Sequence, residues 1–195
     1  MNLSSYIARV LADNGIISKN DEDVCRYGME VFFASVFDVL AVLVLSVFLH
    51  NFLNLVLFFI SFLSLRIYAG GYHADTKLRC FLIMLFVYVL FTFVLRYTHY
   101  RFYFAIEVSA MLITSAMVMS FAPIIHRNKS SNDKERCLYR KVSIVVLAVQ
   151  LLVIVSAMAV DCMSKYVLSF TLGQLAVSLS MIAALVKQKL QRRCK

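Results

Sequence analysis

The chain has 195 residues, of which 62% are hydrophobic and only 16% are charged, and it contains a single proline. A soluble domain of this length needs far more polar surface, so the composition indicates a membrane protein. The formal net charge is +9. The basic residues lie between the apolar runs and form no continuous stripe, which argues against a nucleic-acid partner.

The N-terminal segment 1–28 is polar and mixed in charge. Within it, residues 3–13 predict a short amphipathic helix that Ser4 or Ser5 caps and that ends at Gly15. Its expected apolar face carries Ile7, Val10 and Leu11. Such a helix is expected to lie in the membrane interface, although its length makes its binding weak by itself.

Six apolar runs follow, and each is close to the ~20 residues that a helix needs to cross ~30 Å of hydrocarbon. We therefore expect an all-α fold, a polytopic membrane bundle of about six helices in a single domain over 1–195. The expected spans are roughly 31–49, 52–68, 80–95, 102–122, 142–160 and 167–186. Between and after them, 124–141 predicts a polar loop and 187–195 a basic tail.

The distribution of positive charge predicts the orientation. With six spans, 17 of the 20 Lys and Arg residues fall on the side that holds both termini. The other three, Arg96, Arg101 and Lys165, fall on the opposite side. By the positive-inside rule, both termini and the 66–79 loop are expected in the cytoplasm.

The stretch that carries chemistry runs from Arg66 through Gly70, Gly71 and His73 to Cys80. A cysteine nucleophile acts as its thiolate, and a nearby imidazole takes the thiol proton and later donates a proton to a leaving amine. No second Cys/His pair accompanies these residues, so neither a metal site nor a cofactor is expected.

The spacing of this stretch requires a break in the helix. In one continuous helix, residues seven apart are separated by about 10.5 Å along the axis, beyond the reach of an imidazole for a thiol. Gly70 and Gly71 permit the chain to turn. A new helix capped by Asp75 or Thr76 then holds Cys80 in its first or second turn. Asp75 has a second interpretation, as the residue that orients the imidazole.

These residues resemble the AgrB family (accessory gene regulator B), membrane peptidases of bacterial quorum sensing. The family pattern of an Arg, a Gly-rich turn, a His-Ala pair and a Cys seven residues after the His is matched in register. Two further segments are similar to family motifs: Arg26-Tyr-Gly28-Met-Glu30 before the first span, and Phe121-Ala-Pro123 after the fourth. The chain departs from the family in having Phe121 for a Tyr, and in lacking Lys-Pro pairs in the basic segment 127–141.

The resemblance implies an activity. The family cuts a small amphipathic precursor peptide (AgrD-like) that arrives along the inner leaflet of the bacterial cell membrane. Cys80 would hold the signal portion as a thioester, and a nucleophilic side chain of the peptide would displace it to close a thiolactone or lactone ring. Docking of the precursor on 127–141 stays open, because topology alone explains those charges. A homodimer is compatible with the resemblance, although no residue pattern indicates one.

Other polar residues have two interpretations each. Glu30 and Arg66 either pair, orient the imidazole or hold the precursor, or else reach the interface independently. Asp38 and Glu107 fall inside predicted spans, where they line a cavity or form interhelical hydrogen bonds. A small transporter or channel that uses these two carboxyl groups is the rival function. The other cysteines are expected to be inert free thiols: Cys25, Cys137, Cys162 and Cys194.

Overall fold

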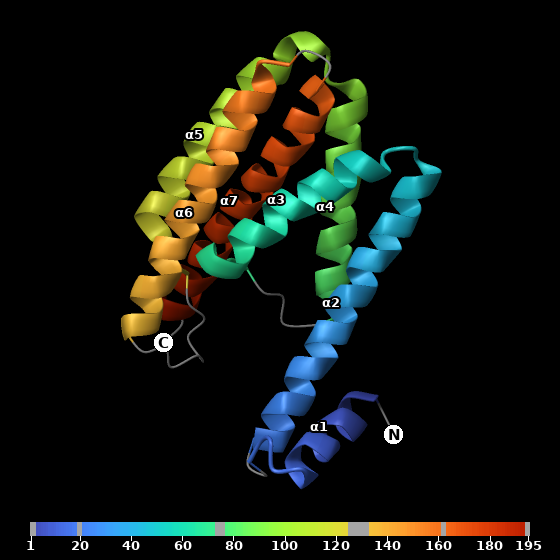
Figure 1. Cartoon of the computed structure of the whole chain (residues 1–195), viewed down its shortest axis with the longest axis vertical. Coiled ribbons are helices and arrows are strands. Elements are labelled where there is room, and N and C mark those ends of the chain that lie inside the picture. Colours follow the sequence, from blue (N-terminus) through green and yellow to red (C-terminus); the bar gives the residue numbers. More distant parts are fainter. Residues whose placement is uncertain (1–2, 19–20, 73–76, 125–132, 161–162, 194–195) are drawn as a thin grey trace.

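The computed structural model describes residues 3–18, 21–72, 77–124, 133–160 and 163–193, and this part of the chain is almost entirely helical (Figure 1). The predicted all-α membrane bundle is confirmed. The α-helices within the described ranges are α1 (Leu3–Asp13), α2 (Glu22–Phe48), α3 (Phe52–Ala69), α4 (Lys77–Tyr97), α5 (Tyr103–Phe121), α6 (Asp133–Met158) and α7 (Ser164–Arg193). A short 3-10 turn, η2 (Tyr100–Phe102), leads into α5.

Successive helices from α2 to α7 alternate in direction (Figure 1). Helices α3, α5 and α7 therefore end, and α4 and α6 begin, toward the same end of the bundle, which we call the site end. The junction between α2 and α3 lies at the opposite end. This alternation brings three segments that are distant in the sequence to the site end: the turn after α3, the end of α5 and the last turns of α7.

Helix α1 packs on α2 through small residues rather than through its largest apolar side chains. Ser4, Ala8 and Ala12 are buried, whereas Val10 is exposed. The spacing of four places these small residues on one face, where they permit close approach of the two helices. The predicted cap was wrong, because α1 begins at Leu3 and includes both serines. The predicted end holds, with Gly15 at a φ of +68°.

Helices α3 and α7 form the centre of the bundle and make its most extensive contact. A glycine permits their crossing: a Cβ built at Gly173 would lie 2.5 Å from the carbonyl oxygen of Phe58 on α3. Small residues at such crossings let helix backbones approach closely in membranes. Two apolar clusters pack around this pair. The first contains Leu65, Ala69, Val118, Ala122, Leu147, Val177 and Met181, and the second contains Val42, Leu55, Phe58, Phe59, Tyr88 and Phe91.

Buried amides tie the central helices together. The Gln150 side chain on α6 donates to the Ser61 carbonyl oxygen at 3.0 Å and to the Ser64 hydroxyl at 2.8 Å, both on α3. Gln174 on α7 donates to the Gln150 side-chain oxygen at 2.9 Å. Interhelical hydrogen bonds of this kind satisfy polar groups where neither lipid nor apolar side chains offer partners.

The outer faces of the helices are apolar. Phe48 and Leu152 are more than 70% exposed, and many other large apolar side chains share this outward position. Among the described residues, four helical stretches are long and apolar enough to cross a membrane: Phe52–Ala69, Tyr100–Phe121, Lys134–Met158 and Ser164–Gln191. Shorter apolar helices cover Val36–Phe48 and Phe81–Tyr97. These stretches coincide with the six apolar runs, and the count of six spans stays a prediction.

The polar segments are more helical than predicted. Part of the expected 124–141 loop belongs to α6, which begins at Asp133, and most of the expected basic tail belongs to α7, which continues to Arg193. Lys, Arg, Glu and Gln are good helix formers, so a helix continues beyond its apolar run until a breaker ends it. Hydropathy therefore marks the apolar part of each helix and not its ends.

Candidate active site

The turn after α3 is built on two glycines, as the sequence predicts. Helix α3 ends at Ala69, and Gly70 and Gly71 follow with φ angles of +80° and +154°. A side chain is strained at positive φ, so glycine is the residue that permits this break. Space is also lacking, because a Cβ at Gly70 would overlap the backbone oxygen of Ile124.

Backbone hydrogen bonds hold this turn between α5 and α7. The Ile124 amide, just beyond the end of α5, donates to the Ala69 carbonyl at 2.9 Å. On the other side, the Tyr72 amide donates to Ser180 on α7, to its carbonyl oxygen at 3.0 Å and to its hydroxyl at 3.2 Å. The turn is thus fixed by segments about 50 and 110 residues further along the chain.

Arg66 binds the turn from within α3. Its guanidinium donates to the Ser180 hydroxyl and to the Tyr72 carbonyl oxygen, and it lies over the Phe62 ring at 5.3 Å from the centroid. A guanidinium presents several donors in a planar fork, which suits it to bind two acceptors at once. The Lys187 ammonium group on α7 lies 5.0 Å from the centre of the Tyr72 ring.

Helix α4 begins at Lys77, so Cys80 is its fourth residue and lies in its first turn. The chain therefore makes the break that the spacing requires, with α3 ending before His73 and a new helix containing Cys80. His73 and Asp75 lie outside the described residues, which resume at Lys77.

Glu30 lies on the N-terminal half of α2, partly buried. This half of α2 continues past the beginning of α4, where α1 packs on it (Figure 1). One residue of the same motif forms an exposed ion pair, in which Arg26 contacts Asp23 at 2.9 Å. In the basic segment, 127–132 lies outside the described residues, whereas Lys134 and Arg136 are exposed on α6.

The two carboxyl groups of the predicted spans are both buried, with Asp38 6% and Glu107 4% exposed. They lie on helices α2 and α5, which stand at opposite sides of the bundle (Figure 1). Among the described residues, no group of three His, Cys, Asp or Glu side chains has the proximity of metal ligands.

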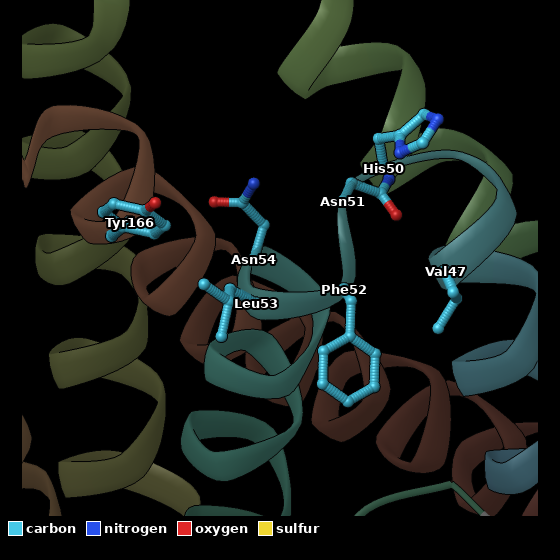
Figure 2. A pocket seen from close by; sticks show the side chains of 7 residues that line it. All are labelled: Val47, His50, Asn51, Phe52, Leu53, Asn54 and Tyr166. Atoms are coloured by element: carbon cyan, nitrogen blue, oxygen red, sulfur yellow. The ribbon is translucent and has the colours of Figure 1, made fainter.

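A hollow of about 380 Å³ lies at the end opposite the site end, where α2 meets α3 (Figure 2). Figure 2 shows the His50, Asn51, Asn54 and Tyr166 side chains around it, and the rest of its lining is Val47, Phe52 and Leu53. Because it opens at the other end of α3, this hollow is separate from the turn that precedes Cys80.

Ser180 binds both Arg66 and Tyr72 and was not predicted from the sequence. A lone serine in an apolar run carries no signal of such a role, because it resembles the many small residues of membrane helices. Only the parallel packing of α3 and α7 brings this serine to the turn.

Comparison with known proteins identifies the family to which the chain is similar. The family model of accessory gene regulator B (AgrB) matches residues 4–184. Among curated proteins, FsrB of Enterococcus faecalis (strain ATCC 47077 / OG1RF) is 29% identical over 98 residues, which make up 50% of this chain and 40% of FsrB. The matched part is thus less than half the length of that relative. No solved structure matches the chain significantly.

The family match includes the Gly70–Gly71 turn, the first turn of α4 and Ser180. It agrees with the apolar helices that mark a membrane protein. The chain therefore belongs to the accessory gene regulator B family.

Proposed function

We propose that this protein is a membrane-embedded cysteine endopeptidase that cleaves a small amphipathic precursor peptide and promotes its cyclisation. Cys80 is the nucleophile, and His73 is its base and the later proton donor. The observation that carries this proposal is the break between α3 and α4, which puts Cys80 in the first turn of a new helix directly after the His73 segment. Family membership supports the same assignment.

The position of Cys80 favours the chemistry. The N-terminus of a helix carries a partial positive charge and unpaired N–H groups, which stabilise a thiolate within the first turn. Only four residues separate Tyr72 from Lys77, and the proposal requires the His73 imidazole to reach Cys80 within this short connection. Asp75 either orients the His73 imidazole or caps α4, and Arg66 with Gly70 and Gly71 holds the turn that precedes them.

Cleavage then involves two proton transfers. His73 takes the thiol proton, and the Cys80 sulfur attacks the carbonyl carbon of the scissile bond. The protonated imidazole donates to the leaving amine nitrogen as the C–N bond breaks. The products of this step are a free C-terminal fragment and an acyl-enzyme in which a thioester joins the signal portion to Cys80.

Ring closure consumes the thioester. A thiol or hydroxyl within the bound peptide attacks the thioester carbonyl, its proton passes to the Cys80 sulfur by way of His73, and the enzyme is regenerated. Exchange of one thioester for another has a small driving force, so the enzyme acts by positioning the nucleophile and excluding water. The product is a thiolactone, or a lactone where the nucleophile is a hydroxyl.

The proposed setting is the bacterial cell membrane, crossed six times, with both termini and the site end in the cytoplasm. The alternating helix directions support this topology, because they bring the turn after α3, the beginning of α6 and the end of α7 to one end (Figure 1). Most of the basic residues lie in these segments, as the positive-inside rule requires for the cytoplasmic face.

The nucleophile is tested by replacement. With a short peptide encoded beside this chain's gene and containing an internal Cys or Ser as substrate, Cys80→Ala should abolish cleavage. The matched control replaces Cys25, Cys137, Cys162 and Cys194 together with Ser and should keep most of the activity. Cleavage that persists in the Cys80→Ala protein would refute the proposal.

A further inference from the structure

We propose that Ser180 on α7 is a positioning residue for the Cys80 site, acting through the backbone of Tyr72, the residue directly before His73. This inference rests on the proposed function, because a positioning residue requires a site to position. It assigns a role to a helix that contributes none of the predicted catalytic residues.

Both oxygen atoms of Ser180, the hydroxyl and the carbonyl, accept hydrogen bonds from groups that form or hold the turn. Its hydroxyl oxygen accepts from the Arg66 guanidinium and from the Tyr72 amide, which occupies both lone pairs. Its carbonyl oxygen accepts from the same Tyr72 amide at 3.0 Å. Arg66 completes the ring by donating to the Tyr72 carbonyl oxygen. Both polar groups of the Tyr72 backbone are therefore bound before the chain reaches His73.

The fit around Ser180 leaves no room for a side chain on the facing residue. A Cβ at Gly71 would overlap the Ser180 hydroxyl oxygen and would lie 2.7 Å from Nη1 of Arg66. The close approach of Gly71 thus brings the turn within hydrogen-bond distance of α7. A glycine at this position has a packing reason beyond its φ angle.

Ser180 also lies beside the buried apolar cluster that joins α7 to α3. Val177 and Met181, its neighbours on α7, are fully buried in the cluster that contains Leu65 and Ala69 of α3. A site is held to its productive geometry by supporting residues on packed helices, and a displacement of about 1 Å reduces a rate on the order of 100-fold. Under the proposal, Ser180 fixes the backbone of Tyr72, the last described residue before His73.

The test uses iodoacetamide as a probe, in a full-length protein whose other four cysteines are replaced with Ser. The rate of Cys80 alkylation is measured against pH, because it reports the fraction of thiolate. Ser180→Ala should lower the rate at pH 7 about tenfold or more and move the midpoint of the profile upward, toward that of His73→Ala. Ser178→Ala is the matched control, since the Ser178 hydroxyl donates only to Leu175 within α7.

A second pair of variants distinguishes the effect of losing the Ser180 hydroxyl from the effect of disturbed packing or folding. Ser180→Thr and Ser180→Val add the same volume, but only Thr keeps the hydroxyl. The Thr protein should retain the low midpoint and the Val protein should lose it, so a packing defect common to both cannot produce the difference. A profile of Ser180→Val that coincides with that of Ser180→Thr would overturn the assignment.

The same experiment distinguishes this inference from the proposed function. If His73→Ala raises the midpoint while Ser180→Ala leaves it at the wild-type value, the role of Ser180 is refuted and the Cys80–His73 site stands. If His73→Ala leaves the profile unchanged, His73 is not the base, and both the proposed mechanism and the role of Ser180 fail.

Discussion

Arg66 on α3 and Ser180 on α7 are 114 residues apart in the chain, and the guanidinium of Arg66 donates a hydrogen bond to the Ser180 hydroxyl. The same guanidinium binds the carbonyl oxygen of Tyr72. The end of α3, the middle of α7 and the turn that leads to His73 are thereby joined in one hydrogen-bonded unit. Arg66 thus binds the backbone of its own chain, a contact that was not among the roles that the sequence suggested for it.

The role of His73 predicts a change in the reactivity of Cys80. A free cysteine titrates near pH 8.5, and a neighbouring imidazole that accepts its proton extends thiolate reactivity to lower pH. His73→Ala should raise the midpoint of Cys80 alkylation and abolish cleavage, because thiolate formation and leaving-group protonation both suffer. His73→Gln should behave in the same way. Identical pH profiles with and without His73 would direct the search for a base to Glu30 and Asp75.

The glycine turn predicts a loss of activity on adding a single methyl group. Gly70→Ala should reduce cleavage strongly, because its Cβ overlaps Ile124 and because a φ of +80° with a ψ of −164° costs a side chain about 1–3 kcal/mol. Gly15→Ala is a matched control, since its φ is +68° but no atom lies within 4 Å of the added Cβ. The initial cleavage rates of the two variants are compared, and the rate of Gly70→Ala should be much the lower. Equal rates would mean that the turn geometry does not matter for activity.

The crossing of α3 and α7 predicts a loss of stability that is independent of the site. Gly173→Ala should lower the free energy of unfolding by about 1–3 kcal/mol, because a Cβ 2.5 Å from the Phe58 oxygen forces the helices apart. Gly28→Ala, a helical position with no atom within 4 Å of the new Cβ, should instead leave stability unchanged or raise it by up to about 1 kcal/mol. Thermal unfolding in detergent compares the two. An unchanged midpoint for Gly173→Ala would show that the crossing is looser than described.

The charge distribution predicts the topology. Single cysteines placed in 70–79, 127–136 and 190–195, in a cysteine-free background, should be protected from a membrane-impermeant thiol reagent in intact cells and labelled after lysis. A cysteine at Lys165 should be labelled from outside. External labelling within 70–79 would contradict the cytoplasmic site and, with it, the proposed delivery of the precursor from the inner leaflet.

Much of the fold follows from the sequence, because hydropathy and turn residues act locally. The end of α1 just before Gly15 and the break after Ala69 were predicted correctly, and the apolar helices coincide with the six apolar runs. The helix ends at Asp133 and Arg193 were missed, since a polar helix has no hydropathy signal. Small residues rather than Val10 form the buried face of α1, because close helix contact depends on the partner and not on the hydrophobicity of the helix alone.

The candidate site likewise combines residues that the local sequence predicts with residues that only the packing of distant helices brings together. Gly70, Gly71 and Cys80 belong to one local stretch, so their spacing predicts the helix break. Ser180 and Ile124 are brought to this turn only by the packing of α7 and α5, and a single sequence carries no information about that proximity. The buried pair formed by Gln150 and Gln174 is another contact of this long-range kind.

The acyl-enzyme is the central claim, and mass spectrometry tests it most directly. The purified protein is mixed with its precursor, the reaction is stopped with acid within the first turnover, and the peptide containing Cys80 is analysed. We expect this peptide to carry the N-terminal portion of the precursor as a thioester that hydroxylamine removes, with no such adduct in the Cys80→Ala protein. Cleavage without any adduct on Cys80, or an adduct on another cysteine such as Cys137, would contradict the proposed mechanism.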